Sequence, residues 1–349
     1  MRSAIKKLVE YTRLKSWLLA VIFFSIGVFA ATGYFLADKN RSEAITSPPD
    51  VTETGVLDYQ TLETYWTNSI EVLGAKEAYS KLLNTYKSVN IHRQHELAHI
   101  FGEILYKTIG LSGVAVCDNS FAFGCYHSFF GFAIQDKGLK ILTELDEACI
   151  KVYGEKGLGC QHGIGHGVIA ELGKNNLSAA LDACLTLSWR EPIGGCTSGV
   201  FMEYNFGTME ESKMRTFSLE EQYFPCTDVD AKYTQACYFE MPSWWLASNN
   251  LDYQKAGLLC EGVSDETDKT ACYRGAGNSI AGMTKYSLND IAQACRLMPN
   301  KEGEVLCIEG ATWIVSAQPE FKDVWRELCE PYSEDEEYYE RCIKSHDFI

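Results

Sequence analysis

The pattern of apolar and polar residues divides the chain into an apolar N-terminal run, a polar stretch and a long helical region. Residues 17–36 (WLLAVIFFSIGVFAATGYFL) carry no charge and are long enough to cross the hydrocarbon core of a bilayer as one helix. Residues 37–56 are polar and contain Pro48 and Pro49, which is typical of a linker. From residue 57 onward, apolar residues recur every three or four positions, and this period predicts α-helices.

The apolar run predicts a single-pass membrane protein. Residues 1–16 form a short tail with five basic side chains and one acidic one, and the positive-inside rule places such a tail in the cytoplasm. The main domain then lies outside the cytoplasm, in a periplasm or at a cell surface. A signal peptide cleaved near the small residues 28–30 is the alternative, but we favour an uncleaved signal-anchor because the uncharged run is longer than the usual signal core.

Fourteen cysteines divide the remaining region, residues 57–349, into repeating units. They form seven pairs whose first members stand 32 to 42 residues apart. In most units an amphipathic helix ends in the first cysteine, a polar loop follows, and the second cysteine opens a helix rich in glycine and aromatic residues. A period of about 35 residues is typical of helical hairpins that repeat along a chain.

We therefore predict an all-α fold of disulfide-stapled helical hairpins, forming either an open α-solenoid or a closed α/α toroid. Glycine allows backbones to approach closely, so we expect the second, glycine-rich helices to be the buried inner ones. In length the hairpins resemble Sel1-like and other tetratricopeptide-type repeats, although their loops and cysteine spacing differ. We favour the toroid because the candidate site described below needs the first inner helix near the third and fourth.

The even cysteine count of an exported chain indicates a disulfide framework. The C-x-x-C pairs expected of thiolate zinc sites do not occur in the sequence. Bonds between the two cysteines that flank each loop account for all fourteen. The sequence leaves other pairings open, such as Cys125 with Cys149, which an antiparallel hairpin also brings near each other.

The net charge of −16 bears on the partners of the domain. Because the first fifteen residues are basic, the rest of the chain is more acidic than this total. Nucleic acids favour basic surfaces, so we expect no nucleic-acid partner. The membrane is the partner of the N-terminal helix, and a peptide, a glycan or another extracytoplasmic ligand stays open for the domain.

Histidines carry the clearest chemical signal. Six of the seven lie between residues 92 and 166. His95 and His99 are four residues apart, as are His162 and His166, and residues at this spacing share one face of a helix. Each pair can therefore present two imidazoles to one metal ion.

The repeat frame brings a fifth imidazole to these pairs. Two residues after the second cysteine of a unit stand His127 and His162, and the segment HELAH fits the same frame with Arg93 in the place of the cysteine. If the inner helices pack side by side, His95, His127 and His162 lie along one rim. His92 precedes this frame and is left out of the site.

We predict a shared metal site with five histidine ligands, which are His95, His99, His127, His162 and His166. Imidazole suits divalent transition metals, and we expect zinc, with iron or copper as alternatives. Five imidazoles exceed the needs of one tetrahedral ion, so a two-metal centre is a further interpretation.

Two glutamates are candidates for activating a metal-bound water. The segment HELAH resembles the H-E-x-x-H motif of zinc metalloproteases, which implies Glu96 as the general base. Gly102 matches the longer metzincin motif, but Leu105 stands in the place of its third histidine. Glu203 is a lone acid in the largely apolar segment CTSGVFMEYNFG, where a buried carboxylate needs a partner.

Glu203 has a second interpretation, in which it lies at the surface or pairs with Arg190 or Arg274. Taken together, these patterns predict a membrane-anchored extracytoplasmic metal-binding protein, and we favour a metal-dependent hydrolase. The alternative is a non-catalytic helical-repeat binding or scaffold module with a structural metal or none.

Overall fold

A computed structural model describes residues 47–52, 55–154, 158–188, 191–207, 214–250, 252–318 and 321–347. Over these residues the chain is all-helical, with fourteen α-helices and no strand, as the sequence predicts. The predicted cytoplasmic tail, the predicted transmembrane helix and most of the predicted linker lie outside the described residues. Within the described ranges, no helix is long and apolar enough to span a bilayer.

Contacts divide the chain into two units, residues 1–80 and 81–349. The described part of the first unit contains α2 (Tyr59–Leu73) and the beginning of α3 (Ala75–Tyr86), both predicted from their apolar period. The helix α2 begins at Asp58, whose side chain accepts a hydrogen bond from the Thr61 amide, and it ends at Gly74, which has a φ of 85°.

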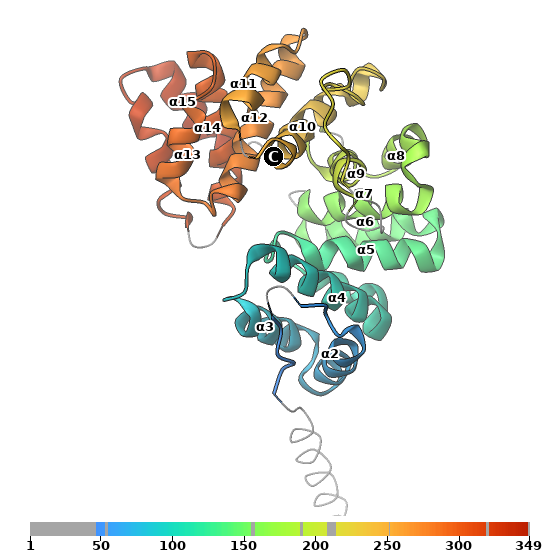
Figure 1. Cartoon of the computed structure of the whole chain (residues 1–349). Helices are drawn as coiled ribbons and strands as arrows, with labels where there is room; N and C mark the ends of the chain where they lie inside the picture. The colour runs from blue at the N-terminus through green and yellow to red at the C-terminus, as the bar shows by residue number, and fades with distance from the viewer. Residues whose placement is uncertain are drawn as a thin grey trace, which may run out of the picture. The chain divides into compact units, whose positions relative to one another are not determined.

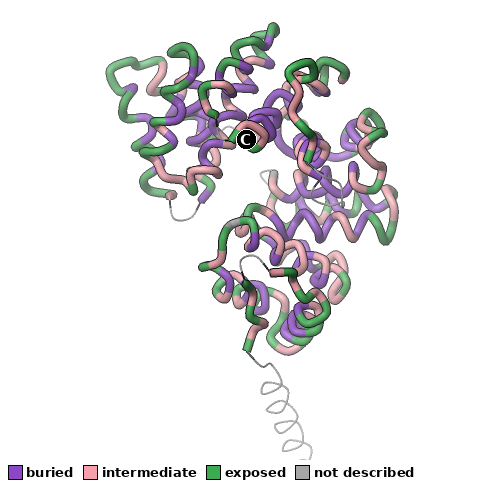
Figure 2. The backbone as a smooth tube through the Cα atoms, viewed as in Figure 1, coloured by how far each residue is buried: buried purple, intermediate pink, exposed green. Residues whose placement is uncertain are grey.

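The second unit contains seven inner helices that contact one another in chain order (Figure 1). Their buried residues are concentrated along these helices, as the purple stretches of Figure 2 show. The inner helices are α4 (Ile91–Ile109), α5 (Gly124–Lys137), α7 (Leu158–Leu172), α9 (Gly195–Phe206), α10 (Thr234–Ser248), α12 (Glu266–Met283) and α14 (Lys301–Ser316).

Shorter helices precede several of the inner ones and are more exposed. They are α6 (Leu142–Tyr153), α8 (Leu177–Cys184), α11 (Tyr253–Glu261) and α13 (Leu288–Cys295), and α15 (Glu336–Lys344) follows the last inner helix. Cys184 ends α8 and Cys295 ends α13, as the repeat pattern predicts. In the last unit the first helix is replaced by short 3₁₀ turns at Trp325–Leu328 and Glu330–Tyr332.

Two inner helices begin earlier than the second cysteine predicts. The α12 helix starts six residues before Cys272, and α14 starts six residues before Cys307. Each has a capping side chain at its start, because Asp265 accepts hydrogen bonds from the amides of Thr267 and Asp268, and Asn300 accepts one from the Gly303 amide. Such caps satisfy amides that have no partner within the helix, so they favour starting the helix there.

All fourteen cysteines form disulfides within their loops, and the alternative bond between Cys125 and Cys149 does not form. The seven bonds join cysteines only 8 to 13 residues apart, and their Cα–Cα distances are 5.4 to 5.7 Å. They join Cys117 to Cys125, Cys149 to Cys160, Cys184 to Cys196, Cys226 to Cys237, Cys260 to Cys272, Cys295 to Cys307, and Cys329 to Cys342.

Glycines bring the backbones of α7 and α9 together. A Cβ atom added at Gly165 would lie 2.0 Å from the carbonyl oxygen of Cys196, and one added at Gly199 would lie 2.0 Å from that of His162. Both distances are far below van der Waals contact, so only glycine permits this approach. The close approach fixes the histidines of α7 against the side chains of α9.

Candidate metal centre

The five predicted histidines come together from three inner helices. They form two groups that share one member, and within each group the nearest ligand nitrogens lie within 4.8 Å of one another. The first group is His95, His99 and His127, and the second is His127, His162 and His166. Each group could hold a metal ion.

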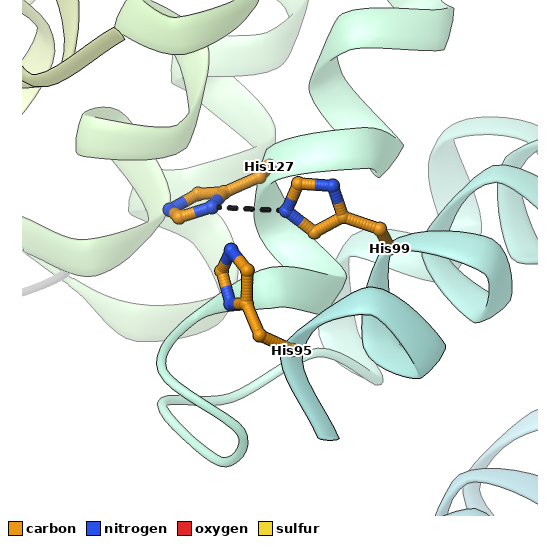
Figure 3. Close-up of side chains that lie close together, drawn as sticks. All are labelled: His95, His99 and His127. Atoms are coloured by element: carbon orange, nitrogen blue, oxygen red, sulfur yellow. Dashed lines mark hydrogen bonds between the residues drawn. The ribbon is translucent and has the colours of Figure 1, made fainter. Parts of the chain in front are cut away.

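In the first group, three rings from α4 and α5 converge (Figure 3). The Nε2 atom of His99 lies 3.3 Å from Nδ1 of His127. A nitrogen of His95 points into the space between these two rings (Figure 3). The ring planes are inclined by 54° to 83° and their centroids lie 4.4 to 5.4 Å apart, so the rings converge without stacking.

A backbone carbonyl sets the tautomer of His95. Its Nδ1 atom lies 3.0 Å from the carbonyl oxygen of Phe121, and because a carbonyl can only accept, Nδ1 must carry the hydrogen. In the neutral ring the lone pair is then on Nε2. This arrangement is the one found for metal-ligating histidines, whose second nitrogen donates to a carbonyl or carboxylate.

The loop that supplies this carbonyl has an uncommon backbone. Phe121, Ala122 and Phe123 have φ values of 50°, 54° and 64°, and the α5 helix begins immediately afterwards at Gly124. For residues other than glycine this left-handed conformation costs roughly 1 kcal/mol or more each, so the surrounding structure must hold it. Such backbone strain is often found at functional sites.

In the second group, a buried carboxylate orients one of the rings. The Nδ1 atom of His166 on α7 lies 2.9 Å from Oε2 of Glu203 on α9, and the two side chains are only 1% and 2% exposed. The carboxylate accepts from Nδ1, so the neutral ring of His166 has its lone pair on Nε2. That atom lies 3.1 Å from Nε2 of His162. The ring of His127 stacks on His166 at a centroid distance of 4.0 Å.

The distances between ring nitrogens match those of metal ligands. Two nitrogens bound to zinc at about 2.05 Å, with a tetrahedral angle between the bonds, are separated by about 3.3 Å. The ring nitrogens of His99 and His127 are 3.3 Å apart, and those of His162 and His166 are 3.1 Å apart. The spacing of each pair therefore suits two ligands of one ion.

Burial favours the neutral form of four of the five imidazoles. It lowers the pKa of His95, although the hydrogen bond to the Phe121 carbonyl acts in the opposite direction. Burial also holds the pKa values of His99, His127 and His162 well below the ordinary histidine value, and neighbouring histidines add to this effect. Neutral imidazole is the form that binds metals, so these rings need lose no proton at neutral pH to act as ligands.

The two candidate general bases lie in different surroundings. Glu96 forms an ion pair of 2.7 Å with Arg93 and lies 3.4 Å from His92, and it belongs to neither histidine group among the described residues. Its role as general base stays a prediction that these contacts do not support. Glu203 belongs with the second group, as the partner of His166.

Of the two arginines proposed as partners of Glu203, Arg274 donates to Glu309 at 2.8 and 2.9 Å, and Arg190 lies outside the described residues, so pairing with Arg190 stays a prediction. The pairing of Arg274 with Glu309 also shows that equivalent positions of neighbouring inner helices adjoin, since each stands two residues after its unit's second cysteine. His127 and His162 obey the same relation, with ring centroids 6.2 Å apart.

Two features of the site were not predicted from the sequence. The first is the Phe121 carbonyl, because a backbone acceptor can belong to any residue and the segment NSFAFG contains no glycine before the helix that would predict left-handed φ values. The second is the choice of His166 as the partner of Glu203, which depends on how closely α7 and α9 approach. Only the glycines of both helices hinted at this approach.

No family model, curated protein or solved structure matches this chain. The fold and the site therefore define its class: a disulfide-rich helical protein with histidine groups that could hold a metal ion.

Proposed function

We propose that this protein is an extracytoplasmic metal-dependent hydrolase whose ion, zinc in the first place, is held by His95, His99 and His127. The convergence of these three imidazoles carries the proposal, because their nitrogens approach one another at the spacing of metal ligands. Three protein ligands are typical of catalytic zinc sites, whereas structural sites use four.

The chain contributes binding, orientation and access. The Phe121 carbonyl fixes the ring of His95, and the buried contact between Glu203 and His166 orders the adjoining helix. His95 and His99 are partly exposed while His127 is buried, so solvent can reach one side of the first group. A zinc ion with three imidazole ligands would supply an open position where water is acidified for hydrolysis.

The cellular setting follows from the cysteines and the N-terminal region. Seven disulfides require an oxidising compartment, which supports export of the domain. We propose residues 17–36 as the membrane anchor, with residues 1–16 in the cytoplasm and the domain in a periplasm or at a cell surface. The substrate class is a peptide, a glycan or another extracytoplasmic molecule.

We also propose that the hairpins of the second unit form one repeat array that closes into a toroid. The chain-order contacts of the inner helices support the array. A hydrogen bond of 3.4 Å from the Asn119 side chain to the Ala317 carbonyl supports closure, because it joins the loop before α5 to the end of α14.

One observation favours the alternative, a non-catalytic module with a structural metal. A cleft of about 930 Å³ is lined by residues such as Tyr106, Phe132 and Lys140 and includes none of the five histidines. His127 and His166 are 4% and 1% exposed. A structural ion should contribute strongly to folding stability, whereas a catalytic ion can be removed with the fold intact.

Metal analysis of the full chain tests the proposal. The chain is exported so that its disulfides form, purified in detergent and compared with the variant His95→Ala/His99→Ala. We expect bound zinc in the parent, loss of the ion from the first group in the variant, and activity on hydrolytic substrates in the parent alone. His92→Ala is the matched control, because His92 is exposed and outside both groups.

A well-folded parent that binds no metal, even after zinc is added back, would rule the hydrolase out. If the parent binds zinc but its melting temperature collapses when a chelator removes the ion, and no hydrolysis is found, the structural-metal alternative is the better account.

A further inference from the structure

We infer that the histidine cluster holds two metal ions, one in each group, with His127 bound to both. This inference rests on the proposed function and adds a second ion to it. The two groups share His127 alone, and four other imidazoles remain, two for each ion.

The position of His127 suits a shared ligand. Its Nδ1 atom faces Nε2 of His99 at 3.3 Å, which directs that nitrogen to the first ion. The other ring nitrogen lies on the side of the ring away from His99 (Figure 3). His162 and His166 complete the second group around the same ring, with centroids 6.2 and 4.0 Å from that of His127.

Sharing the ring requires the loss of one proton. A neutral imidazole has a lone pair on one nitrogen and a hydrogen on the other. When the second ion binds, the N–H proton of His127 passes to solvent and the nitrogen's electron pair forms the new metal bond. The ring then carries one negative charge between two dications, which reduces their mutual repulsion.

Glu203 supplies a second negative charge beside the second group. It is 2% exposed and bonds to Nδ1 of His166, so it lies beside the second group. A carboxylate in this position makes a histidine a stronger metal ligand. In the first group, the corresponding partner of His95 is the neutral Phe121 carbonyl. The Glu203 carboxylate thus serves the second group, where an ion must bind next to one already present.

The first group binds its metal ion before the second group does. In the first, the rings are inclined and converge, whereas in the second the ring of His166 is stacked on His127 with an angle of 19° between the planes. Stacked rings do not direct their lone pairs to one point, so one of them must turn when the second ion binds. The first ion therefore binds to the first group at lower metal concentration.

Copper(II) titration of the full chain tests the shared ligand. The exported protein, stripped of metal, receives one and then two equivalents of Cu²⁺, which imidazoles bind well. Native mass spectrometry counts the ions and electron paramagnetic resonance measures the integrated copper signal. We expect two ions per chain, a full signal at one equivalent, and a fall in signal at the second equivalent, because the shared ring couples the two unpaired electrons.

Variants of each group provide the comparison. His162→Ala/His166→Ala should bind one copper with a full, uncoupled signal, and so should His95→Ala/His99→Ala. His92→Ala should behave like the parent. Circular dichroism and the absence of free thiols confirm that each variant is folded.

The outcomes separate this inference from the proposed function. One ion in the parent, lost only in the His95/His99 variant, overturns the second site and leaves the hydrolase proposal standing. Two ions with twice the signal of one show that no ligand is shared, which overturns the bridge. A folded parent that binds no ion would contradict both the two-ion inference and the hydrolase proposal.

Discussion

At the scale of single residues, the site depends on what each histidine's second nitrogen contacts. His95 donates to a carbonyl and His166 donates to Glu203, so both neutral rings have their lone pairs on Nε2. The same hydrogen bond makes Glu203 a positioning residue, because it orients the ring of His166.

Replacing Glu203 by glutamine should weaken metal binding by the second group. The amide oxygen can still accept from His166, but it lacks the negative charge that makes the imidazole a stronger ligand, so affinity should fall about 10- to 100-fold. Chelator competition at the second equivalent of metal measures this affinity. Glu171→Gln on the exposed part of α7 is the control. Unchanged affinity in Glu203→Gln would show that the carboxylate does not support the ligand.

A second buried carboxylate gives a pH prediction. Glu240 on α10 is fully enclosed, and burial raises its pKa to about 8 although a hydrogen bond with Ser198 lowers it. Between the ordinary glutamate value and pH 8, the folded state holds a proton that the unfolded state has lost. The contribution of Glu240 to the free energy of unfolding therefore falls as pH rises, by at most about 1.4 kcal/mol per unit, until pH passes 8.

Thermal unfolding of the metal-free protein between pH 6.5 and 8.5 measures this effect. Unfolded histidines still bind protons near pH 6.5, so burial of His95, His99, His127 and His162 adds a slope of the opposite sign, which is the same in parent and variant. Glu240→Gln cannot titrate, so its profile should lack the downward contribution, and the difference between the two profiles measures Glu240. An identical slope in both proteins would mean that Glu240 is ionised when folded.

At the scale of elements, the glycine-lined contact between α7 and α9 links stability to the site. The two helices bring His162 and His166 next to Glu203, and their backbones meet at Gly165 and Gly199. A larger side chain at Gly165 or Gly199 would separate the α7 histidines from Glu203, and it would also disturb the core.

We expect Gly165→Ala to destabilise the protein by about 1–3 kcal/mol, because the new Cβ would overlap the Cys196 carbonyl. Metal binding at the second group should weaken as well. Gly282→Ala on α12 is the matched control, since no atom lies within 4 Å of its added Cβ, and it should raise stability by up to about 1 kcal/mol. Melting temperatures and metal titrations compare the two. Equal effects would show that the helices can move apart freely.

At the scale of the whole molecule, the sequence predicts much of the fold because its signals are local. The period of apolar residues predicted α2 and α3, and the spacing of the cysteines predicted the order of helices and loops. The early starts of α12 and α14 differ from the cysteine pattern because the side chains of Asp265 and Asn300 cap the helices there. In the site, repeat position brought five histidines together. The partners of Glu96 and His95 depend on rotamers and a backbone carbonyl, which no residue pattern specifies.

The disulfide pattern has a consequence for how the chain matures. Each disulfide joins two cysteines that are consecutive in the sequence, and no bond spans more than 13 residues. A chain that enters an oxidising compartment from its N-terminal side can form each bond from the two cysteines that arrived last. Correct oxidation can thus proceed in order during translocation, without waiting for downstream segments and without later exchange of partners.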